Sequence, residues 1–221
     1  MTRALFDREL RELHDAVLFL GSMAEKAIVE AMEALRDGDL EWSRRIIEED
    51  KLINAKRFEI EERCIFVIAT QQPMATDIRD LVSVLYIVTD LERIADHAEG
   101  VAKINLMMGP EPPPRRLGLL PAMADRAVAM LRDTLKAYIE RDVEAARRIC
   151  EADDEVDRLQ DRVYEEAFKA MIADPSTIQR NTYLIWASHN FERIADRCTN
   201  ICERIIYTVT GQMEETNVSK Y

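Results

Sequence analysis

The sequence contains few helix breakers and no long apolar run. Of 221 residues, only 6 are glycine and 7 are proline. Few breakers among many Ala, Leu, Glu and Arg residues favour long helices. No uninterrupted stretch of about 18 apolar residues occurs, so the sequence predicts no membrane-spanning helix. The hydrophobic share of 48% is nevertheless enough to bury a core.

Positive charge is also in short supply. The chain carries 30 Lys and Arg residues against 42 Asp and Glu residues, a formal net charge of −12. Nucleic-acid binding depends on positive charge that neutralises phosphates, so we expect no direct binding to DNA or RNA. The acidic excess favours divalent cations and basic partner surfaces. It disfavours anionic lipid surfaces, so we expect membrane association only indirectly, through partners.

Motifs that carry catalysis are missing. There is no Gly-rich phosphate loop, no Gly-x-Ser-x-Gly and no His-Glu-x-x-His. A ferritin-like di-iron bundle requires Glu-x-x-His on two helices. None of the three histidines, His14, His97 and His189, has a glutamate three positions before it. We therefore predict no catalytic residue and expect that the protein is not an enzyme.

The first residues and the cysteines indicate a cytoplasmic protein. The start of the chain lacks the apolar segment of a signal peptide, so we expect a cytoplasmic location and reduced thiols. Cys198 and Cys202 are four residues apart, which is not the Cys-x-x-Cys spacing of a redox or zinc site. We expect these side chains to pack in the core.

The two halves of the chain resemble each other. The pentapeptide Glu-Arg-Ile-Ala-Asp occurs twice, 100 positions apart, and two further segments recur at offsets of 100 and 103. The matched segments are 92–96 with 192–196, 23–27 with 123–127, and 44–46 with 147–149. A repeat of this length is larger than a solenoid unit and indicates a duplicated domain.

A proline-rich segment separates the halves. Three consecutive prolines at 112–114 cannot continue a helix. The predicted organisation is a first three-helix repeat at 1–108, a linker at 109–116, a second three-helix repeat at 117–211 and a C-terminal tail at 212–221.

Turn residues and periodicity define three helices in each half. Breaks are predicted at 37–39, 72–73, 141–142 and 174–175, with Asp39 and Asp142 as N-caps and Gly211 after the last helix. Apolar residues recur at alternating steps of three and four, the seam of helices crossing at about 20°. We therefore predict an all-α fold of two tandem three-helix bundles, with six long helices and an elongated shape.

The repeated pentapeptide carries two carboxylates per half. With the apolar seam taken as the buried face, Glu92 and Asp96 are expected on the opposite face, as are Glu192 and Asp196. Residues four apart lie one turn above each other, so the ionised pairs repel unless cations are near. Carboxylate oxygens are hard ligands suited to divalent metals.

Further acidic residues extend the predicted metal set. Glu99 lies near Asp96, whereas the matching position 199 is threonine. Asp50 and Asp153 interrupt apolar stripes in the second helix of each half, and Asp157 follows Asp153 by one turn. The candidate metal ligands are Glu92, Asp96, Glu192, Asp196, Asp50, Asp153, Asp157 and Glu99.

Simpler readings of these residues remain open. An acidic protein carries many such pairs on solvated faces, and Arg93 and Arg193 can neutralise the pentapeptide carboxylates instead of a metal. Asp50 and Asp153 can fix register as buried polar residues or pair with a neighbouring helix. His97 follows Asp96 directly and is expected near the first set.

The chain resembles the PhoU family at 91–97 and 191–203, and again at 72–79 and 206–211. The resemblance covers roughly residues 6–211. It implies tandem three-helix bundles and negative regulation of the bacterial phosphate-starvation response. The implied partners are the ATPase of the phosphate-specific ABC transporter and a sensor histidine kinase. No partner-binding residue is predicted.

The same resemblance implies a cofactor. Some members bind iron or other divalent metals through Glu/Asp-x-x-x-Asp motifs, so Fe, Mn, Mg or Zn is expected at 92–96 and 192–196. A homodimer is also expected. The alternatives are a helical adaptor that needs no metal and a di-iron carboxylate protein. Ala95 and Ala195 stand where many members have glycine, a change that favours the helix.

Overall fold

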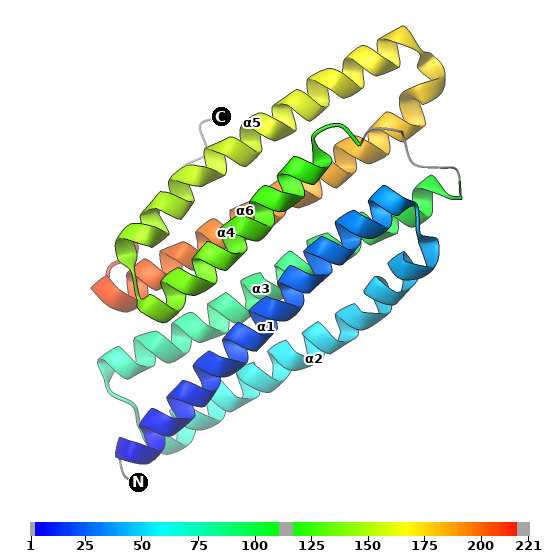
Figure 1. The fold of residues 1–221 in the computed structure, drawn as a ribbon. Helices are drawn as coiled ribbons and strands as arrows, with labels where there is room; N and C mark the ends of the chain where they lie inside the picture. Colours follow the sequence, from blue (N-terminus) through cyan, green and yellow to red (C-terminus); the bar gives the residue numbers. More distant parts are fainter. Residues whose placement is uncertain (1–2, 111–116, 216–221) are drawn as a thin grey trace.

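A computed structural model describes residues 3–110 and 117–215. These residues form helices and no strands (Figure 1), which confirms the predicted all-α class of six long helices. The elements are α1 (Arg3–Asp37), α2 (Leu40–Gln71), α3 (Ala75–Met108), α4 (Leu120–Glu140), α5 (Val143–Ala173), the short 3-10 helix η1 (Pro175–Thr177) and α6 (Ile178–Thr210).

The helices end where the turn residues predict. Asp39 and Asp142 are both N-caps, and their side chains accept hydrogen bonds from the backbone N–H of Trp42 at 2.8 Å and Ala145 at 2.9 Å. Gly211 follows α6 with a φ of +75°, a conformation that glycine adopts without strain. The predicted linker at 109–116 lies outside the described residues from 111 on, as does the predicted tail from 216 on.

The two halves lie side by side along their length. Helices α1–α3 form one bundle and α4–α6 the other, and the whole is elongated (Figure 1). The most extensive contact between any two helices joins α3 to α6, and α1 also contacts α4. Helices α3 and α6 therefore lie at the centre, each covered by its own bundle and by the other half.

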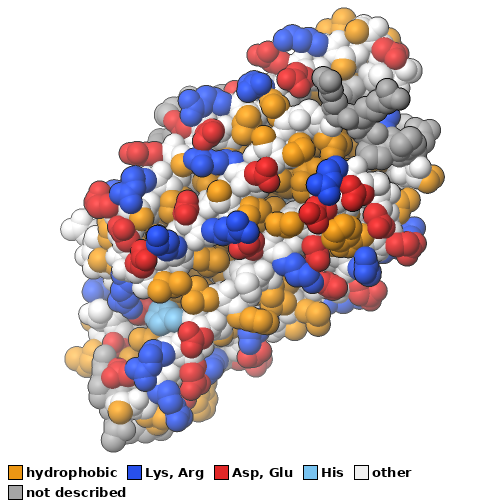
Figure 2. All heavy atoms as spheres, in the orientation of Figure 1, with side chains coloured by type: hydrophobic (Ala, Val, Ile, Leu, Met, Phe, Trp, Pro, Cys, Tyr) orange, Lys and Arg blue, Asp and Glu red, His pale blue; other side chains and the backbone are white. Residues whose placement is uncertain are grey.

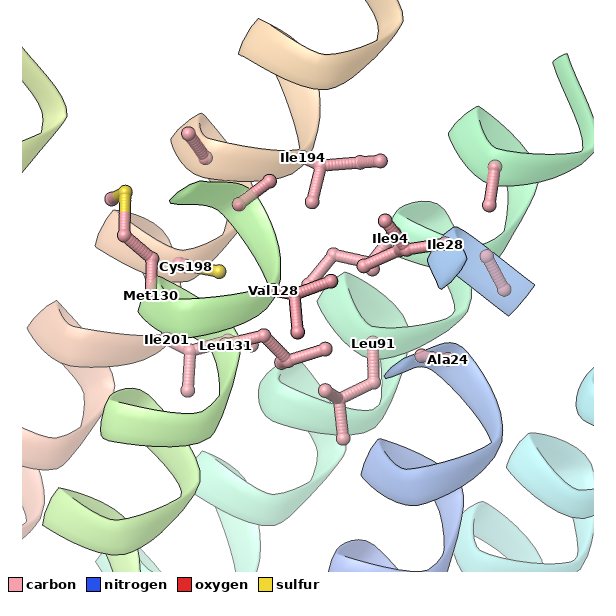
Figure 3. Close-up of a cluster of buried hydrophobic side chains, with 14 of the residues drawn as sticks. Ala24, Ile28, Leu91, Ile94, Val128, Met130, Leu131, Ile194, Cys198 and Ile201 are labelled. Atoms are coloured by element: carbon pink, nitrogen blue, oxygen red, sulfur yellow. The ribbon is translucent and has the colours of Figure 1, made fainter. Parts of the chain in front are cut away.

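One hydrophobic core runs through both halves. Most residues of the alternating three- and four-residue seams are buried, as predicted, and all four cysteines are buried and free. Figure 3 shows Leu91 and Ile94 of α3 beside Val128 of α4 and Ile194 of α6 in a single apolar cluster. Residues of both halves thus share one apolar interior, and each half shields part of the other from water.

Charges are mixed on the molecular surface. On the face in Figure 2, the described Lys and Arg side chains alternate with Asp and Glu side chains. Within the described residues, no helix combines the length and apolar character that crossing a lipid bilayer requires.

Candidate metal centre

The predicted acidic residues collect between the last two helices of each half. The first acidic cluster consists of Asp50 of α2 with Glu92, Asp96 and Glu99 of α3. The second acidic cluster consists of Asp153 and Asp157 of α5 with Glu192 and Asp196 of α6. In the second cluster, the negative charges of Asp196, Asp157 and Asp153 all act on Glu192. The duplicated sequence thus produces a duplicated arrangement of carboxylates.

Three carboxylates of the first cluster converge. Asp50, Asp96 and Glu99 each offer a carboxylate oxygen, and these atoms lie within 4.8 Å of one another. Asp50 Oδ2 accepts a hydrogen bond from Asn54 Nδ2 at 2.7 Å, while Oδ1 is buried and has no hydrogen-bond partner among the described residues. Burial, followed by repulsion from Glu99 and Asp96, raises the pKa of Asp50 to about 6.

Glu92 does not project outward. Its side chain is only 8% exposed, because α2 packs over this side of α3. The Arg57 Nε atom lies 3.9 Å from Glu92 Oε1, and Arg93 Nε lies 3.5 Å from Oε2. The expectation that all four pentapeptide carboxylates face away from the bundle is therefore wrong for Glu92. It assumed one buried face per helix, whereas α3 contacts three other helices.

The second cluster also contains a partly buried carboxylate whose ionisation is disfavoured. Burial, and next the charge of Asp196, raises the pKa of Glu192 to about 7. Its Oε2 atom is buried, makes no hydrogen bond within the described residues and lies 3.1 Å from His189 Nδ1. Asp153 is 2% exposed. Thr199 does not replace Glu99, because its hydroxyl donates to the Asp196 carbonyl oxygen at 2.8 Å.

The protein's own cations neutralise part of each cluster. Arg93 donates to Asp96 at 2.7 Å and Arg193 donates to Asp196 at 3.0 Å, as the sequence allowed. Lys103 donates to Glu99 in the first cluster. Asp50 and Glu192 take no part in these three ion pairs.

The donor set fits a divalent cation. Carboxylates that are partly buried and face one another disfavour being charged together, and a hard cation removes that repulsion. The buried oxygens Asp50 Oδ1 and Glu192 Oε2 have no hydrogen-bond donor within the described residues. A cation would gain most at these two atoms, since buried acceptors otherwise lack a partner, whereas Arg93 Nε already lies 3.5 Å from the buried Glu92 Oε2.

One further expectation concerns a single residue, and two residues near the clusters were not foreseen. His97 does not join the first cluster; its ring nitrogen lies 3.2 Å from Asn190 Oδ1 at the contact between the halves, and burial lowers its pKa. Arg57 beside Glu92 was missed, as was its repeat counterpart Gln160. Both lie seven residues after the cluster aspartate of their helix, so heptad spacing would have revealed them.

Comparison with known proteins follows the same internal repeat. The family model described as the PhoU domain matches residues 17–104 and again 120–205. The chain belongs to the PhoU family. Both members of the internal repeat are thus PhoU domains, and the sequence resemblance is confirmed.

Relatives match over nearly the full chain. The phosphate-specific transport system accessory protein PhoU homolog of Clostridium acetobutylicum is 39% identical over 218 residues, which cover 98% of this chain and 100% of the relative. The phosphate-specific transport system accessory protein PhoU of Escherichia coli strain K12 is 32% identical over 207 residues, 94% of this chain and 86% of the relative.

Solved PhoU structures share the fold. The crystal structure of PhoU from Pseudomonas aeruginosa has a TM-score of 0.88 at 32% identity and covers 94% of this chain and 100% of that one. The phosphate transport system regulatory protein PhoU from Streptococcus pneumoniae also gives 0.88, at 31% identity, over 95% and 99% of the two chains.

Proposed function

We propose that this protein negatively regulates the bacterial phosphate-starvation response from the cytoplasm, through contacts with other proteins rather than by catalysis. The observation that carries the proposal is the double match to the PhoU domain across both halves. Relatives covering nearly the whole chain are named for the phosphate-specific transport system, which supports a transporter-related partner. The proposed partners are the transporter ATPase and a sensor histidine kinase, and a homodimer is proposed as the assembly.

We further propose that the acidic clusters bind divalent cations, with Fe, Mn, Mg or Zn as candidates. In the first cluster, Asp50 of α2 and Asp96 and Glu99 of α3 would hold the ion, which would join the two helices. An ion that neutralises this face changes what it presents to a partner. Regulation follows only if the partner's two states bind the loaded face with different affinity, since equal affinity shifts no equilibrium.

A second candidate is a helical adaptor that acts without metal. The ion pairs of Arg93 with Asp96 and of Arg193 with Asp196 favour it, because each supplies a permanent cation to the pentapeptide. Under this proposal the clusters stabilise α3 and α6, and partner contact depends on surface shape and charge alone.

Gene deletion tests the regulatory role. In phosphate-rich medium, a deletion strain is expected to express a phosphate-starvation reporter that the intact strain represses. The wild-type chain should restore repression, and so should the control Glu165→Gln, which changes an exposed carboxylate outside both clusters. Normal repression in the deletion strain would contradict the proposed function.

A cluster variant separates the two candidates. The variant combines Asp50→Asn, Asp96→Asn, Glu192→Gln and Asp196→Asn. Elemental analysis should show loss of bound metal at unchanged helicity, and the reporter should be de-repressed. Repression by a chain that carries no metal would instead support the adaptor.

A further inference from the structure

The two acidic clusters differ in charge at one matched position. Arg57 of α2 lies seven residues after Asp50, and Gln160 of α5 lies seven residues after Asp153. The repeat therefore places a permanent cation in the first half where the second half has a neutral amide. Position 54 is asparagine where position 157 is aspartate, so the second half also gains a carboxylate.

Arg57 is held in place beside Glu92. Its Nη1 donates to Glu61 Oε1 at 2.8 Å, and its guanidinium carbon lies 4.3 Å from the centre of the Phe58 ring. Its Nε lies 3.9 Å from Glu92 Oε1, and the two side chains are only 18% and 8% exposed. Burial weakens screening by salt, so this guanidinium acts on the Glu92 end of the cluster while it also pairs with Glu61.

The position of the second cluster that matches Arg57 carries no charge. Gln160 is neutral, and its buried Nε2 has no hydrogen-bond partner within the described residues. Tyr164 stands in the place of Glu61, close enough to Glu192 for that carboxylate to raise its pKa after burial has done so. The negative charges of Asp196, Asp157 and Asp153 act on Glu192, and the positive charge of Arg193 offsets them in part. The His189 ring nitrogen Nδ1 lies 3.1 Å from Glu192 Oε2 and carries a charge only when it is protonated.

We infer that Arg57 is a built-in cation at Glu92 that confines divalent-metal binding in the first cluster to Asp50, Asp96 and Glu99, whereas the second cluster binds its metal at Glu192. This inference rests on the metal part of the proposed function. A fixed guanidinium repels a dication that approaches Glu92. At the matched place, Gln160 adds no repulsion. The two halves therefore bind metal at different places and fill at different metal concentrations.

A reciprocal exchange tests this difference with Mn²⁺ alone as the probe. Arg57→Gln gives the first cluster the residue of the second, and Gln160→Arg does the reverse. Each change is measured with the other cluster disabled, so that one cluster is read at a time. The disabling changes are Glu192→Gln with Asp196→Asn for the first measurement and Asp96→Asn with Glu99→Gln for the second.

Calorimetric titration and elemental analysis after dialysis give the affinity and the number of ions. Arg57→Gln is expected to tighten Mn²⁺ binding or add a second ion, and Gln160→Arg to weaken binding roughly tenfold or more. Arg57→Lys keeps the charge and should behave as wild type, as should the neutral Gln160→Met. Circular dichroism confirms that each variant folds.

Two results would overturn the inference in distinguishable ways. If the unaltered chain binds Mn²⁺ but both exchanges leave affinity and stoichiometry unchanged, the role of Arg57 is wrong and the metal proposal stands. If the unaltered chain binds none of the candidate divalent metals, the metal proposal itself is wrong, and the inference is wrong with it.

Discussion

At the scale of single residues, the clusters hold carboxylates in positions where the ionised form is disfavoured. Asp50 and Glu192 are partly buried among other acids, and their pKa values rise to about 6 and about 7. Burial is the first cause for both, because the charged form loses solvation. These two groups therefore contribute least to the stability of the metal-free protein at neutral and alkaline pH, where they ionise.

The stability of the metal-free protein should follow the titration of Glu192. Between about pH 4.5 and about pH 7 the unfolded chain has released the Glu192 proton while the folded chain retains it. The free energy of unfolding therefore falls as pH rises through this window. Glu192→Gln cannot ionise, so at pH 8 in chelator it should melt a few °C higher than wild type, roughly 2–4 °C for each kcal/mol gained.

Thermal unfolding at pH 5 and pH 8 measures this effect. The difference between wild type and Glu192→Gln should be small at pH 5 and larger at pH 8. The control is Glu165→Gln, an exposed carboxylate of α5. A Glu192→Gln melting curve that keeps the full pH dependence of wild type would refute the explanation.

At the scale of elements, the two halves differ in how the connection between their first two helices is held in place. In the first half, the Asn105 side-chain nitrogen of α3 lies 2.9 Å from the Ala34 carbonyl oxygen, 3.2 Å from that of Asp39 and 2.9 Å from Ser43 Oγ. One buried amide thus ties α3 to the α1–α2 turn. In the second half the matching residues are apolar, and Ala146 and Ile205 are both buried.

This difference predicts a non-additive pair of variants. Asn105→Ala removes the tie and is expected to lower the free energy of unfolding by about 1–3 kcal/mol. The double variant Ser43→Ala, Asn105→Ile copies the second half and should be closer to wild type, because replacing both polar partners leaves fewer unsatisfied groups. Urea unfolding measures both. A double variant less stable than Asn105→Ala would contradict this reasoning.

At the scale of the whole molecule, partly buried polar contacts join the halves. Asp90 of α3 accepts hydrogen bonds from Arg197 at 3.3 Å and Asn200 at 3.4 Å, both from α6. Close approach is helped by Gly100, where a β-carbon would lie 2.7 Å from Asn190 Oδ1. With an apolar core shared across the same helices, the two PhoU domains are expected to unfold together.

Breaking the Asp90 contact should destabilise both halves at once. Asp90→Ala leaves the largely buried Arg197 without its carboxylate, and the expected loss is about 2–4 kcal/mol. Adding Arg197→Leu should recover part of this loss, because no unpaired charge then remains. Urea unfolding followed by circular dichroism should show one transition at lower midpoint. Two separated transitions in wild type would contradict the shared core.

Much of the architecture was predictable because it depends on local chemistry. The caps Asp39 and Asp142, the break at Gln72–Pro73 and the apolar seams are written in short stretches of sequence, and all are confirmed. The grouping of Asp50 with Asp96 and Glu99 was predictable because α2 and α3, which carry these residues, belong to one bundle. The burial of Glu92 was not, since it depends on which helix covers α3.

The sequence alone determined that this chain forms six helices in two similar halves, and that each half repeats an acidic pentapeptide. Helical periodicity and turn residues act over a few positions, so they need no knowledge of distant neighbours. Only the tertiary structure decided that α3 and α6 meet at the centre, that His97 bridges the halves and that Arg57 lies against Glu92. Those contacts join residues far apart in the chain, and their position depends on how whole helices pack.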